Sequence, residues 1–201
     1  MRIVVARAPG RVSLAGGGTD LPSYYERHGG AVVSFAISSG ATATISERSS
    51  DLDLVSTDHD VRELITPERY PRRMRYPFLA REFVTLQKAV AWHFGLDRAR
   101  VSVSSELPTA GGLGSSAAIC TALVTAAAAY LGEPMNRWTI AAIAARIEMS
   151  VLRRPCGKQD PFASAFGGIN LIEFLRDGTV SVDPIPVAPG IRDELERHLL
   201  L

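Results

Sequence analysis

One stretch of this sequence, residues 107–118, constrains the fold more than any other. It reads Leu-Pro-Thr-Ala-Gly-Gly-Leu-Gly-Ser-Ser-Ala-Ala, and it lies between an alternating β-branched run, Val101–Ser105, and an alanine-rich apolar run, Ala117–Tyr130. The alternation predicts a strand, and the apolar run followed by Gly132 predicts a buried helix that ends at a glycine. The sequence therefore predicts a strand, a glycine-rich loop and the start of a helix in direct succession.

The glycine-rich loop is predicted to bind an anion. Gly111, Gly112 and Gly114 have no Cβ, so their backbone can approach a ligand closely. Ser115 and Ser116 fall where the helix begins, and the free N–H groups and positive dipole end there suit a phosphate chain. The loop is neither a P-loop, because no lysine follows Gly114, nor a dinucleotide-binding loop, because position 117 is alanine. The alternative is a tight turn with a serine cap, but such a turn requires fewer glycines and serines.

The remaining patterns predict short strands and helices. The predicted strands are residues 3–7, 11–15, 31–37, 41–47, 52–56, 169–174 and 180–184, and the predicted helices are 78–94, 117–130, 136–153 and the start of one at 191–201. Turns at residues 8–10 and 38–40 separate the first two pairs of strands, and the polar residues 58–76 are expected to be irregular. Strands and helices in this order predict an α/β domain of two layers.

The charge, histidine and cysteine content argue against several classes of partner. The 201 residues include 22 basic and 21 acidic side chains, so the net charge of +1 gives no basis for binding nucleic acid or an anionic membrane. The apolar run 117–131 is shorter than the ~20 residues that a membrane-spanning helix needs. The four histidines form no metal-ligand spacing. Cys120 and Cys156 are far apart, which predicts a reducing compartment, and we expect a cytoplasmic protein.

Asp20 ends a second glycine-rich segment, Gly16-Gly-Gly-Thr-Asp20, which directly follows a predicted strand. We expect Asp20 on an exposed loop, where a carboxylate can accept hydrogen bonds from sugar hydroxyls. Taken alone, the segment is better explained as a glycine turn with Asp20 capping a helix over Leu21–Arg27.

Two further acidic residues, Glu148 and Asp160, lie 12 positions apart near the end of the sequence. A helix from Asn136 to about Arg153 places Glu148 about 100° from Ile147, at the edge of the apolar face, where charges are usually solvated. Asp160 falls in a loop between Gly157 and the pair Gly167-Gly168, where an Asx turn is the structural alternative.

Three segments, in this order, resemble motifs of the GHMP kinases, the superfamily of galactokinase, homoserine kinase, mevalonate kinase and phosphomevalonate kinase. Ala8-Pro-Gly-Arg-Val and Gly16-Gly-Gly-Thr-Asp20 resemble the first motif, which lines the substrate pocket. Pro108 to Ala118 resembles the second, whose loop wraps the ATP phosphates. Glu148 followed by Gly157-Lys-Gln-Asp160 resembles the acid–base pair of the family. The resemblance covers residues 6 to about 174 and implies the fold of ribosomal protein S5 domain 2, which the N-terminal domain of these kinases adopts.

The resemblance also implies a role for particular residues. The ATP phosphates would be bound by Pro108, Gly111, Gly112, Leu113, Gly114, Ser115, Ser116 and Ala117. Ser116 and Glu148 would bind Mg²⁺. Asp160 would orient or deprotonate the acceptor hydroxyl, and Lys158 or Arg11 would offset charge on the γ-phosphate or keep Asp160 ionised. The sugar would be bound by Gly17, Gly18, Thr19 and Asp20.

The first motif indicates a branch of the superfamily. Galactokinases carry Gly-Glu-His-Thr-Asp where this chain has Gly16–Asp20, and mevalonate kinases usually carry lysine at the position of Arg11. The closest resemblance is to the D-glycero-D-manno-heptose 7-phosphate kinases, so we predict ATP-dependent phosphorylation of a heptose 7-phosphate. Alternatives are an L-fucose or galactose-type kinase, a nucleotide-binding fragment without activity, and an RNA-contacting module, which the net charge argues against.

The third glycine-rich motif of the family is not present after Gly168. We therefore expect residues 1–190 to form the N-terminal, ATP- and substrate-binding domain, and residues 191–201 to start a truncated C-terminal domain. Because the third motif helps to complete the active site in the family, we expect no turnover by the 201-residue chain alone.

Overall fold

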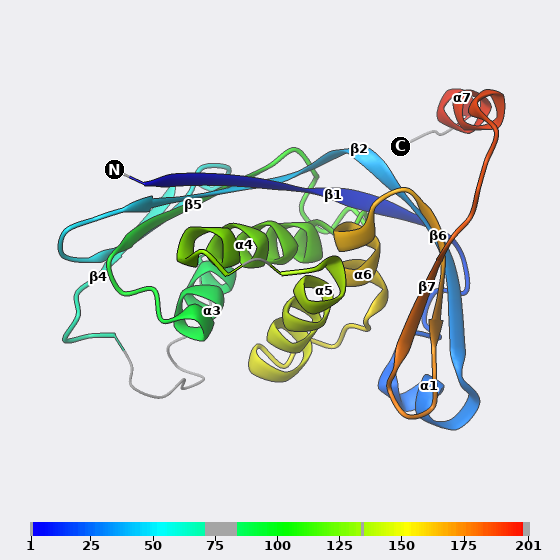
Figure 1. Ribbon diagram of the computed structural model, residues 1–201, viewed down its shortest axis with the longest axis horizontal. Helices are drawn as coiled ribbons and strands as arrows, with labels where there is room; N and C mark the ends of the chain where they lie inside the picture. Colours follow the sequence, from blue (N-terminus) through cyan, green and yellow to red (C-terminus); the bar gives the residue numbers. More distant parts are fainter. Residues whose placement is uncertain (1, 71–83, 134, 199–201) are drawn as a thin grey trace.

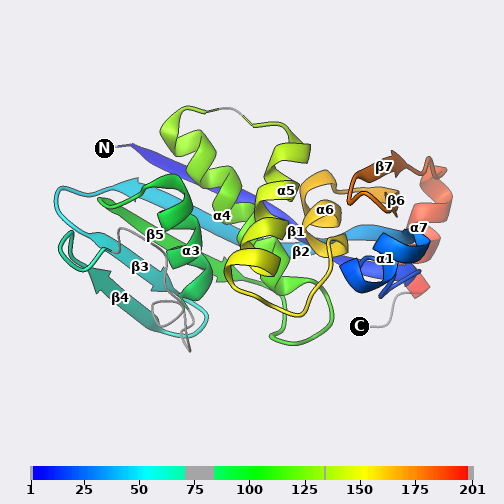
Figure 2. The same cartoon turned by 90° about the horizontal axis from the view of Figure 1, so that it is seen from below.

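The computed structural model describes residues 2–70, 84–133 and 135–198, which form one mixed sheet with helices packed on one face (Figures 1 and 2). The elements are β1 (Ile3–Ala15), α1 (Pro22–His28), β2 (Gly30–Glu47), β3 (Leu52–Ser56), β4 (Val61–Ile65), α3 (Thr85–Phe94), β5 (Ala99–Ser105), α4 (Ser115–Leu131), α5 (Arg137–Arg146), the π-helical segment η1 (Ile147–Val151), α6 (Gln159–Phe166), β6 (Ile169–Phe174), β7 (Val180–Pro184) and α7 (Pro189–His198). Helices α3, α4, α5 and α6 cover the same face of the sheet (Figure 1). This arrangement confirms the predicted two-layer α/β class.

Strand β2 holds the two halves of the sheet together. The described strands are ordered β4-β3-β5-β2-β6-β7, and β1 pairs with β2 off this path. The C-terminal part of β2, Ala41–Glu47, pairs with β5, and its N-terminal part, Gly30–Phe35, pairs with β6. The strand β5, which precedes the glycine-rich loop, and the strand β6, which follows α6, are therefore both paired with β2.

The turns predicted at residues 8–10 and 38–40 are wrong. Strand β1 runs through the first position and β2 through the second, because the two strands pair along both segments. The register is irregular where Pro9 faces Gly40 and Arg11 faces Ala36, so the glycines and the proline mark a bulge and not a chain reversal. Gly40 fits here because a Cβ would lie 2.3 Å from the carbonyl oxygen of Ala8.

Three other predictions change at their boundaries. Strand β4 lies in the region expected to be irregular, where it pairs antiparallel with β3. Of the helix predicted over residues 78–94, residues 85–94 form α3, and residues 78–83 lie outside the described residues. The helix predicted to run to about Arg153 is α-helical to Arg146 and π-helical from Ile147 to Val151.

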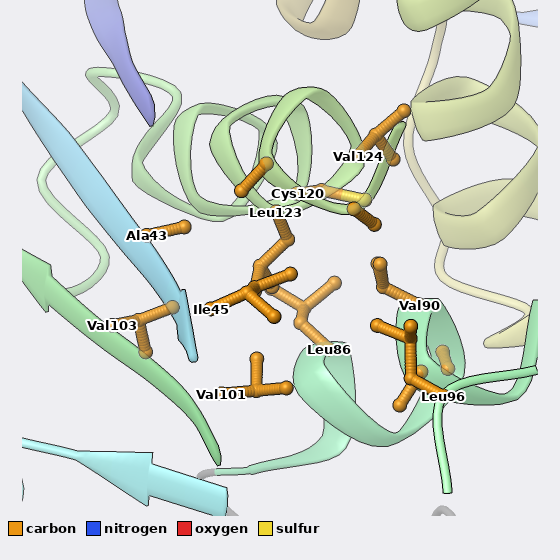
Figure 3. Packing of buried hydrophobic residues seen from close by; sticks show 14 of the residues in the cluster. Ala43, Ile45, Leu86, Val90, Leu96, Val101, Val103, Cys120, Leu123 and Val124 are labelled. Carbon is orange, nitrogen blue, oxygen red and sulfur yellow. The ribbon is translucent and has the colours of Figure 1, made fainter. Parts of the chain in front are cut away.

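The main core lies between α4, α3 and the covered face of the sheet. Figure 3 shows Leu123 of α4 directed at Ile45 of β2, with Leu86 and Val90 of α3 and Val101 of β5 around them. The alanines of α4 are small, and most of them are buried, so this helix can pack closely on the sheet. None of the helices in the described part of the chain is long and apolar enough to cross a membrane.

A second, smaller cluster anchors α6. Phe162 of α6 is buried with Phe174 and Tyr25, whose rings lie 6.2 Å apart. Trp138 of α5 packs edge-on against Phe162 with 5.3 Å between the ring centroids. This cluster fixes the position of α6 relative to β6 and α5, and with it the side chains at the N-terminus of α6.

Asp53 of β3 is a fully buried carboxylate surrounded by three arginines. Arg62 donates two hydrogen bonds to it, at 2.7 and 3.0 Å, and Arg48 and Arg100 each lie 3.1 Å from Oδ2. Burial raises the pKa of Asp53, but the hydrogen bond from Arg62 and the charges of the three arginines lower it by more, so the pKa lies below its usual value. The ionised side chain therefore stabilises the fold at neutral pH.

We expect Asp53→Asn to lower the free energy of unfolding by about 1–3 kcal/mol at pH 7, because three guanidinium groups lose their counter-charge. Since the folded-state pKa is lowered, this contribution is complete above the unfolded-state pKa of about 3.9 and is lost as the pH falls through the folded value. Urea unfolding at pH 7 and at pH 3 measures both effects. The control is Asp51→Asn, which removes a charge two positions away whose hydrogen-bond partner is Ser50. Equal losses for the two variants at pH 7 would contradict the assignment.

Candidate active site

The glycine-rich loop joins β5 to α4, as the sequence predicts, and Gly114 is the N-cap residue of α4. Gly114 has φ 71°, a left-handed conformation that strains other residues. A Cβ at this position would lie 3.5 Å from Oδ2 of Asp160 and 3.5 Å from Cγ of Arg11. The last glycine of the loop is therefore in close contact with the two residues that the sequence assigns to catalysis.

Arg11 of β1 holds the loop and α6 together. Its Nε and Nη2 donate hydrogen bonds to Oδ1 of Asp160 at 2.8 and 2.5 Å. Its Nη1 donates to the carbonyl of Gly112 at 2.6 Å, and its backbone N–H donates to the carbonyl of Leu113 at 3.0 Å. One residue thus fixes both the path of the loop and the orientation of the Asp160 carboxylate.

Asp160 lies in the first turn of α6, so the prediction that it lies in a loop is wrong. A carboxylate in the first turn of a helix is favoured by the helix dipole. Burial nevertheless raises the pKa of Asp160, the charge and hydrogen bonds of Arg11 lower it, and the result lies above the usual value. The carboxylate is therefore a stronger proton acceptor than an exposed aspartate.

Asp20 is buried and does not lie on an exposed loop. It also does not cap the adjacent helix α1, whose N-cap residue is Leu21. Both expectations for its position are therefore wrong. Its Oδ2 accepts a hydrogen bond from the backbone N–H of Gln159 at 3.0 Å, and its carbonyl accepts one from Lys158 at 3.3 Å. These bonds satisfy free N–H groups at the start of α6, where Lys158 supplies no side-chain cap. Gly157 leaves room for the carboxylate, because a Cβ there would lie 2.0 Å from Oδ2.

The other residues predicted to bind the sugar are Gly17, Gly18 and Thr19, of which only the glycines border open space. The hydroxyl of Thr19 donates to the carbonyl of Gly16 at 2.8 Å and contacts the backbone of Ala31, so it is already bonded within the protein. The space where a Cβ of Gly18 would lie is open, and a Cβ at Gly17 would lie 3.7 Å from the Ser13 hydroxyl. The loop backbone therefore borders open space while its polar side chains are turned inward.

Glu148 is buried in the π-helical segment η1, and not solvated at a helix edge as expected. A π-helical turn holds more residues than an α-helical turn, so adjacent side chains are separated by a smaller angle and Glu148 faces inward beside Ile147. Oε1 of Glu148 accepts hydrogen bonds from the hydroxyl of Ser116 and, at 3.1 Å, from Nη1 of Arg154. Burial raises the pKa of Glu148, and the bonds from Ser116 and Arg154 offset part of this increase.

The structure brings Ser116 and Glu148 together, as expected for a shared cation, and their oxygens fit Mg²⁺. This ion prefers oxygen ligands and is usually bound by one or two carboxylates together with substrate phosphates. In residues 2–70, 84–133 and 135–198, no group of three or more His, Cys, Asp or Glu side chains could bind a metal ion. A cation at Ser116 and Glu148 would therefore take its other ligands from water or from the phosphate oxygens of a nucleotide.

Two basic residues differ from the sequence-based expectations. The ammonium of Lys158 donates to the carbonyl of Gly178 at 2.5 Å and lies 4.8 Å from the centre of the Tyr25 ring, so the structure does not bring it to Asp160. Arg154, which the sequence analysis missed, contacts Ser116 and Glu148 instead. No sequence signal marks Arg154, because residues six positions apart do not share a helix face and the turn after η1 is needed to bring it back.

A cavity of about 250 Å³ lies beside the loop and the start of α4. Its polar wall includes Ser115, Ser116 and Arg154, and its apolar wall includes Leu86, Leu107 and Ile119. The cavity therefore offers an apolar surface next to hydroxyl groups, a guanidinium group and a helix N-terminus, a combination that suits a phosphorylated heterocyclic compound.

Fold and site together define an α/β domain in which a glycine-rich loop, the buried acid Glu148 and the partly buried acid Asp160 lie near the N-terminal end of α4. The family model described as GHMP kinases N terminal domain matches residues 80–168, so this part of the chain is similar to the N-terminal domain of a GHMP kinase. Members of this family are kinases and use ATP as the phosphate donor.

Individual relatives agree with this family. The chain is 28% identical over its whole length to D-glycero-alpha-D-manno-heptose 7-phosphate kinase of Campylobacter jejuni, covering 59% of that protein. It is 32% identical over 82% of its length to mevalonate kinase of Archaeoglobus fulgidus, covering 51% of it. A crystal structure of a D-glycero-D-manno-heptose 1-phosphate kinase from B. thetaiotaomicron superimposes with a TM-score of 0.86 at 29% identity, over 96% of this chain and 63% of that one. The chain thus spans about half to three-fifths of the length of these curated relatives.

We expect Asp20→Ala to lower the free energy of unfolding by about 1 kcal/mol, because α6 loses its cap, and Asp20→Asn to cost less, because an amide oxygen still accepts a hydrogen bond. Urea unfolding measures the loss, and hydrogen exchange at the Gln159 amide reports on the cap itself. Faster exchange is expected in Asp20→Ala and not in Asp183→Asn, whose carboxylate accepts from Ser181 on β7. Unchanged exchange at Gln159 in Asp20→Ala would disprove the capping role.

Proposed function

We propose that this chain forms the ATP- and substrate-binding part of a kinase that phosphorylates a hydroxyl group of a sugar or sugar phosphate. The observation that carries the proposal is the position of Gly114, at the N-terminus of α4, next to the paired side chains of Arg11 and Asp160: a Cβ on Gly114 would lie 3.5 Å from both. A helix N-terminus binds phosphate, and a carboxylate beside it accepts a proton from the attacking hydroxyl. Phosphoryl transfer needs these two functions close together, since its catalysis is mainly positioning and charge stabilisation.

The glycine loop is proposed to bind the triphosphate through its backbone. The residues assigned to ATP are Pro108, Gly111, Gly112, Leu113, Gly114, Ser115, Ser116 and Ala117. The left-handed conformations of Gly112 and Gly114 and the N-terminal position of Ser115 in α4 support this role. The neighbouring cavity would take the base or the ribose, with Leu107 and Ile119 against the apolar part.

Ser116 and Glu148 would hold Mg²⁺ together with phosphate oxygens of the nucleotide. When bound, the ion supplies positive charge to the transferring phosphoryl group. The support for this assignment is the direct hydrogen bond between the two side chains and the burial of Glu148.

Asp160 is proposed to be the base. The acceptor oxygen forms a bond to the γ-phosphorus, the bond between that phosphorus and the oxygen bridging to the β-phosphate breaks, and the hydroxyl proton passes to the Asp160 carboxylate. Arg11 orients that carboxylate and keeps it ionised, and its remaining charge faces the phosphates near Gly112. Lys158 has no part in this step, because it bonds to Gly178.

A heptose 7-phosphate is proposed as the acceptor. The support is the segment Gly16–Asp20, in which Gly17 and Gly18 replace bulky residues of galactokinases and leave open space at Gly18, together with the heptose phosphate kinases among the relatives. A fucose or galactose-type acceptor is the alternative.

We further propose that residues 1–190 form one domain and that residues 191–201, which include most of α7, belong to the next, so that catalysis requires both.

Asp160→Asn is expected to lower kcat by about 10²–10⁴-fold while leaving the Kd for ATP nearly unchanged, because the amide keeps the shape of the side chain but cannot accept the proton. The assay follows ADP formation in the protein with its second domain, with heptose 7-phosphate, fucose, galactose and mevalonate as acceptors. The control is Asp183→Asn on β7, which changes an exposed carboxylate. Wild-type turnover by Asp160→Asn would overturn the base assignment, and preference for galactose or mevalonate would overturn the proposed acceptor.

Arg11→Met is expected to move the acidic limb of the kcat/KM profile to higher pH. Burial raises the pKa of Asp160 and Arg11 lowers it, so removal of Arg11 raises it further. A base acts only when ionised, and the rate therefore begins to fall at a higher pH in the variant. Arg7→Met on the same strand is the control, since Arg7 pairs with Glu106 and not with Asp160. An acidic limb that stays in place in Arg11→Met would show that Asp160 does not control it.

A further inference from the structure

Arg154 has no role in the mechanism above, although it contacts both proposed cation ligands. Its Nη1 donates hydrogen bonds to the hydroxyl of Ser116 and to Oε1 of Glu148, and the same hydroxyl donates to the same carboxylate oxygen. One guanidinium nitrogen, one hydroxyl and one carboxylate oxygen therefore form a closed triangle. Arg154 places a positive charge at the point where two oxygen ligands for a cation meet.

The backbone around Arg154 is shaped to make this contact. The π-helical segment η1 turns Glu148 inward, and Arg153 takes a left-handed conformation with φ 52°. The backbone N–H of Arg154 then donates to the carbonyl of Glu148 at 3.0 Å, which returns the chain to the carboxylate. π-Helical turns and left-handed conformations outside glycine are uncommon and concentrate at functional sites. Their occurrence on both sides of one contact indicates that the contact has a function.

The exposed part of Arg154 is directed at the cavity beside the glycine loop. The side chain is 36% exposed, whereas that of Glu148 is 5% exposed, and Arg154 lines the cavity together with Ser115 and Ser116. Its Nε and Nη2 make no hydrogen bond to any residue that the structure describes. A guanidinium group has five N–H donors in a planar fork that matches phosphate oxygens, so the unused donors are available to a ligand in the cavity.

We propose that Arg154 is a phosphate-binding residue of the nucleotide site, which neutralises Glu148 before nucleotide binds and then moves to the phosphate chain. This inference rests on the proposed function. A buried carboxylate needs a counter-charge, and Arg154 supplies it in the structure described here. A metal ion bound to Ser116 and Glu148 would occupy the place of Nη1, and the two positive charges would repel each other. Arg154 already lines the cavity, where the same ligand would bring negative charge.

The alternative is a fixed structural pair, in which Arg154 remains on Glu148 whether or not nucleotide is bound. The two possibilities differ in what removal of the guanidinium does. If Arg154 binds phosphates, its loss weakens the binding of ATP in the absence of metal. If Arg154 also competes for Glu148, its loss strengthens the binding of a metal ion in the absence of nucleotide. A fixed pair predicts neither change.

The test compares wild type with Arg154→Met, Arg154→Lys and the control Arg153→Met, which removes an exposed positive charge from the neighbouring residue. Isothermal titration calorimetry gives the Kd for ATP in EDTA, and titration with Mn²⁺ without nucleotide gives the metal affinity. We expect Arg154→Met to weaken ATP binding in EDTA by about 10–100-fold, as for loss of a hydrogen bond to a charged group. The same variant should bind Mn²⁺ more tightly, Arg154→Lys should be intermediate in both, and Arg153→Met should match wild type.

A second comparison guards against loss of folding when Glu148 loses its partner. The pair Glu148→Gln and Arg154→Met/Glu148→Gln differs only at Arg154, and neither variant has a buried carboxylate at position 148, so the same loss of ATP affinity in EDTA is expected between them. If wild type binds ATP and neither comparison lowers the affinity, Arg154 is a fixed structural partner and this inference is wrong. If wild type binds no ATP under any condition, the proposed function itself is wrong, and the inference with it.

Discussion

The guanidinium of Arg11 holds together segments that lie far apart in the sequence. It bonds to Asp160, 149 positions away, and to the carbonyl of Gly112, 101 positions away. Charge-assisted hydrogen bonds of this kind are stronger than neutral ones and depend on geometry. They make the path of the glycine loop depend on the position of α6, and the position of α6 is set by its aromatic cluster and by Asp20 at its N-terminus. The proposed phosphate loop and base are therefore coupled through one side chain.

Asp53, Glu148 and Asp160 each face arginine side chains, but in different ways. Asp53 has three arginines, and its pKa is lowered. Asp160 and Glu148 have one arginine each, and their pKa values are raised because burial outweighs the attraction. A carboxylate with excess counter-charge stabilises a fold, whereas one with too little retains affinity for a proton or a cation. This difference separates the structural acid from the two that are proposed to act in catalysis.

Local patterns predicted the loop and α4. The glycines there are required by the backbone conformation of a few neighbouring residues, and the alanines by close packing of the helix. The positions of Asp20, Glu148 and Lys158 were not predicted. Asp20 caps a helix that begins 139 positions later, and Glu148 faces inward only because η1 is π-helical. Lys158 and Asp160 are two positions apart, but they diverge because one precedes α6 and the other lies in its first turn. These features depend on contacts between distant residues, or on an irregular helical turn, and a short stretch of sequence predicts neither.

The site also depends on an irregularity in the pairing of β1 with β2. The outward-facing side chains of β1 alternate from Ile3 through Val5 to Arg7, and continued alternation would direct Arg11 to the same uncovered face of the sheet. Between the pairs Pro9–Gly40 and Arg11–Ala36, however, one residue of β1 lies opposite three residues of β2, so the extra residues are on β2. Such bulges bend a strand, increase its twist and redirect side chains. The bend is held from both sides, since Ser164 of α6 donates to the carbonyl of Pro9 at 2.7 Å and a Cβ at Gly10 would meet Leu107 at 2.8 Å. The proline and glycine that suggested a turn therefore lie at this register shift, directly before Arg11, where Gly10 leaves room for Leu107.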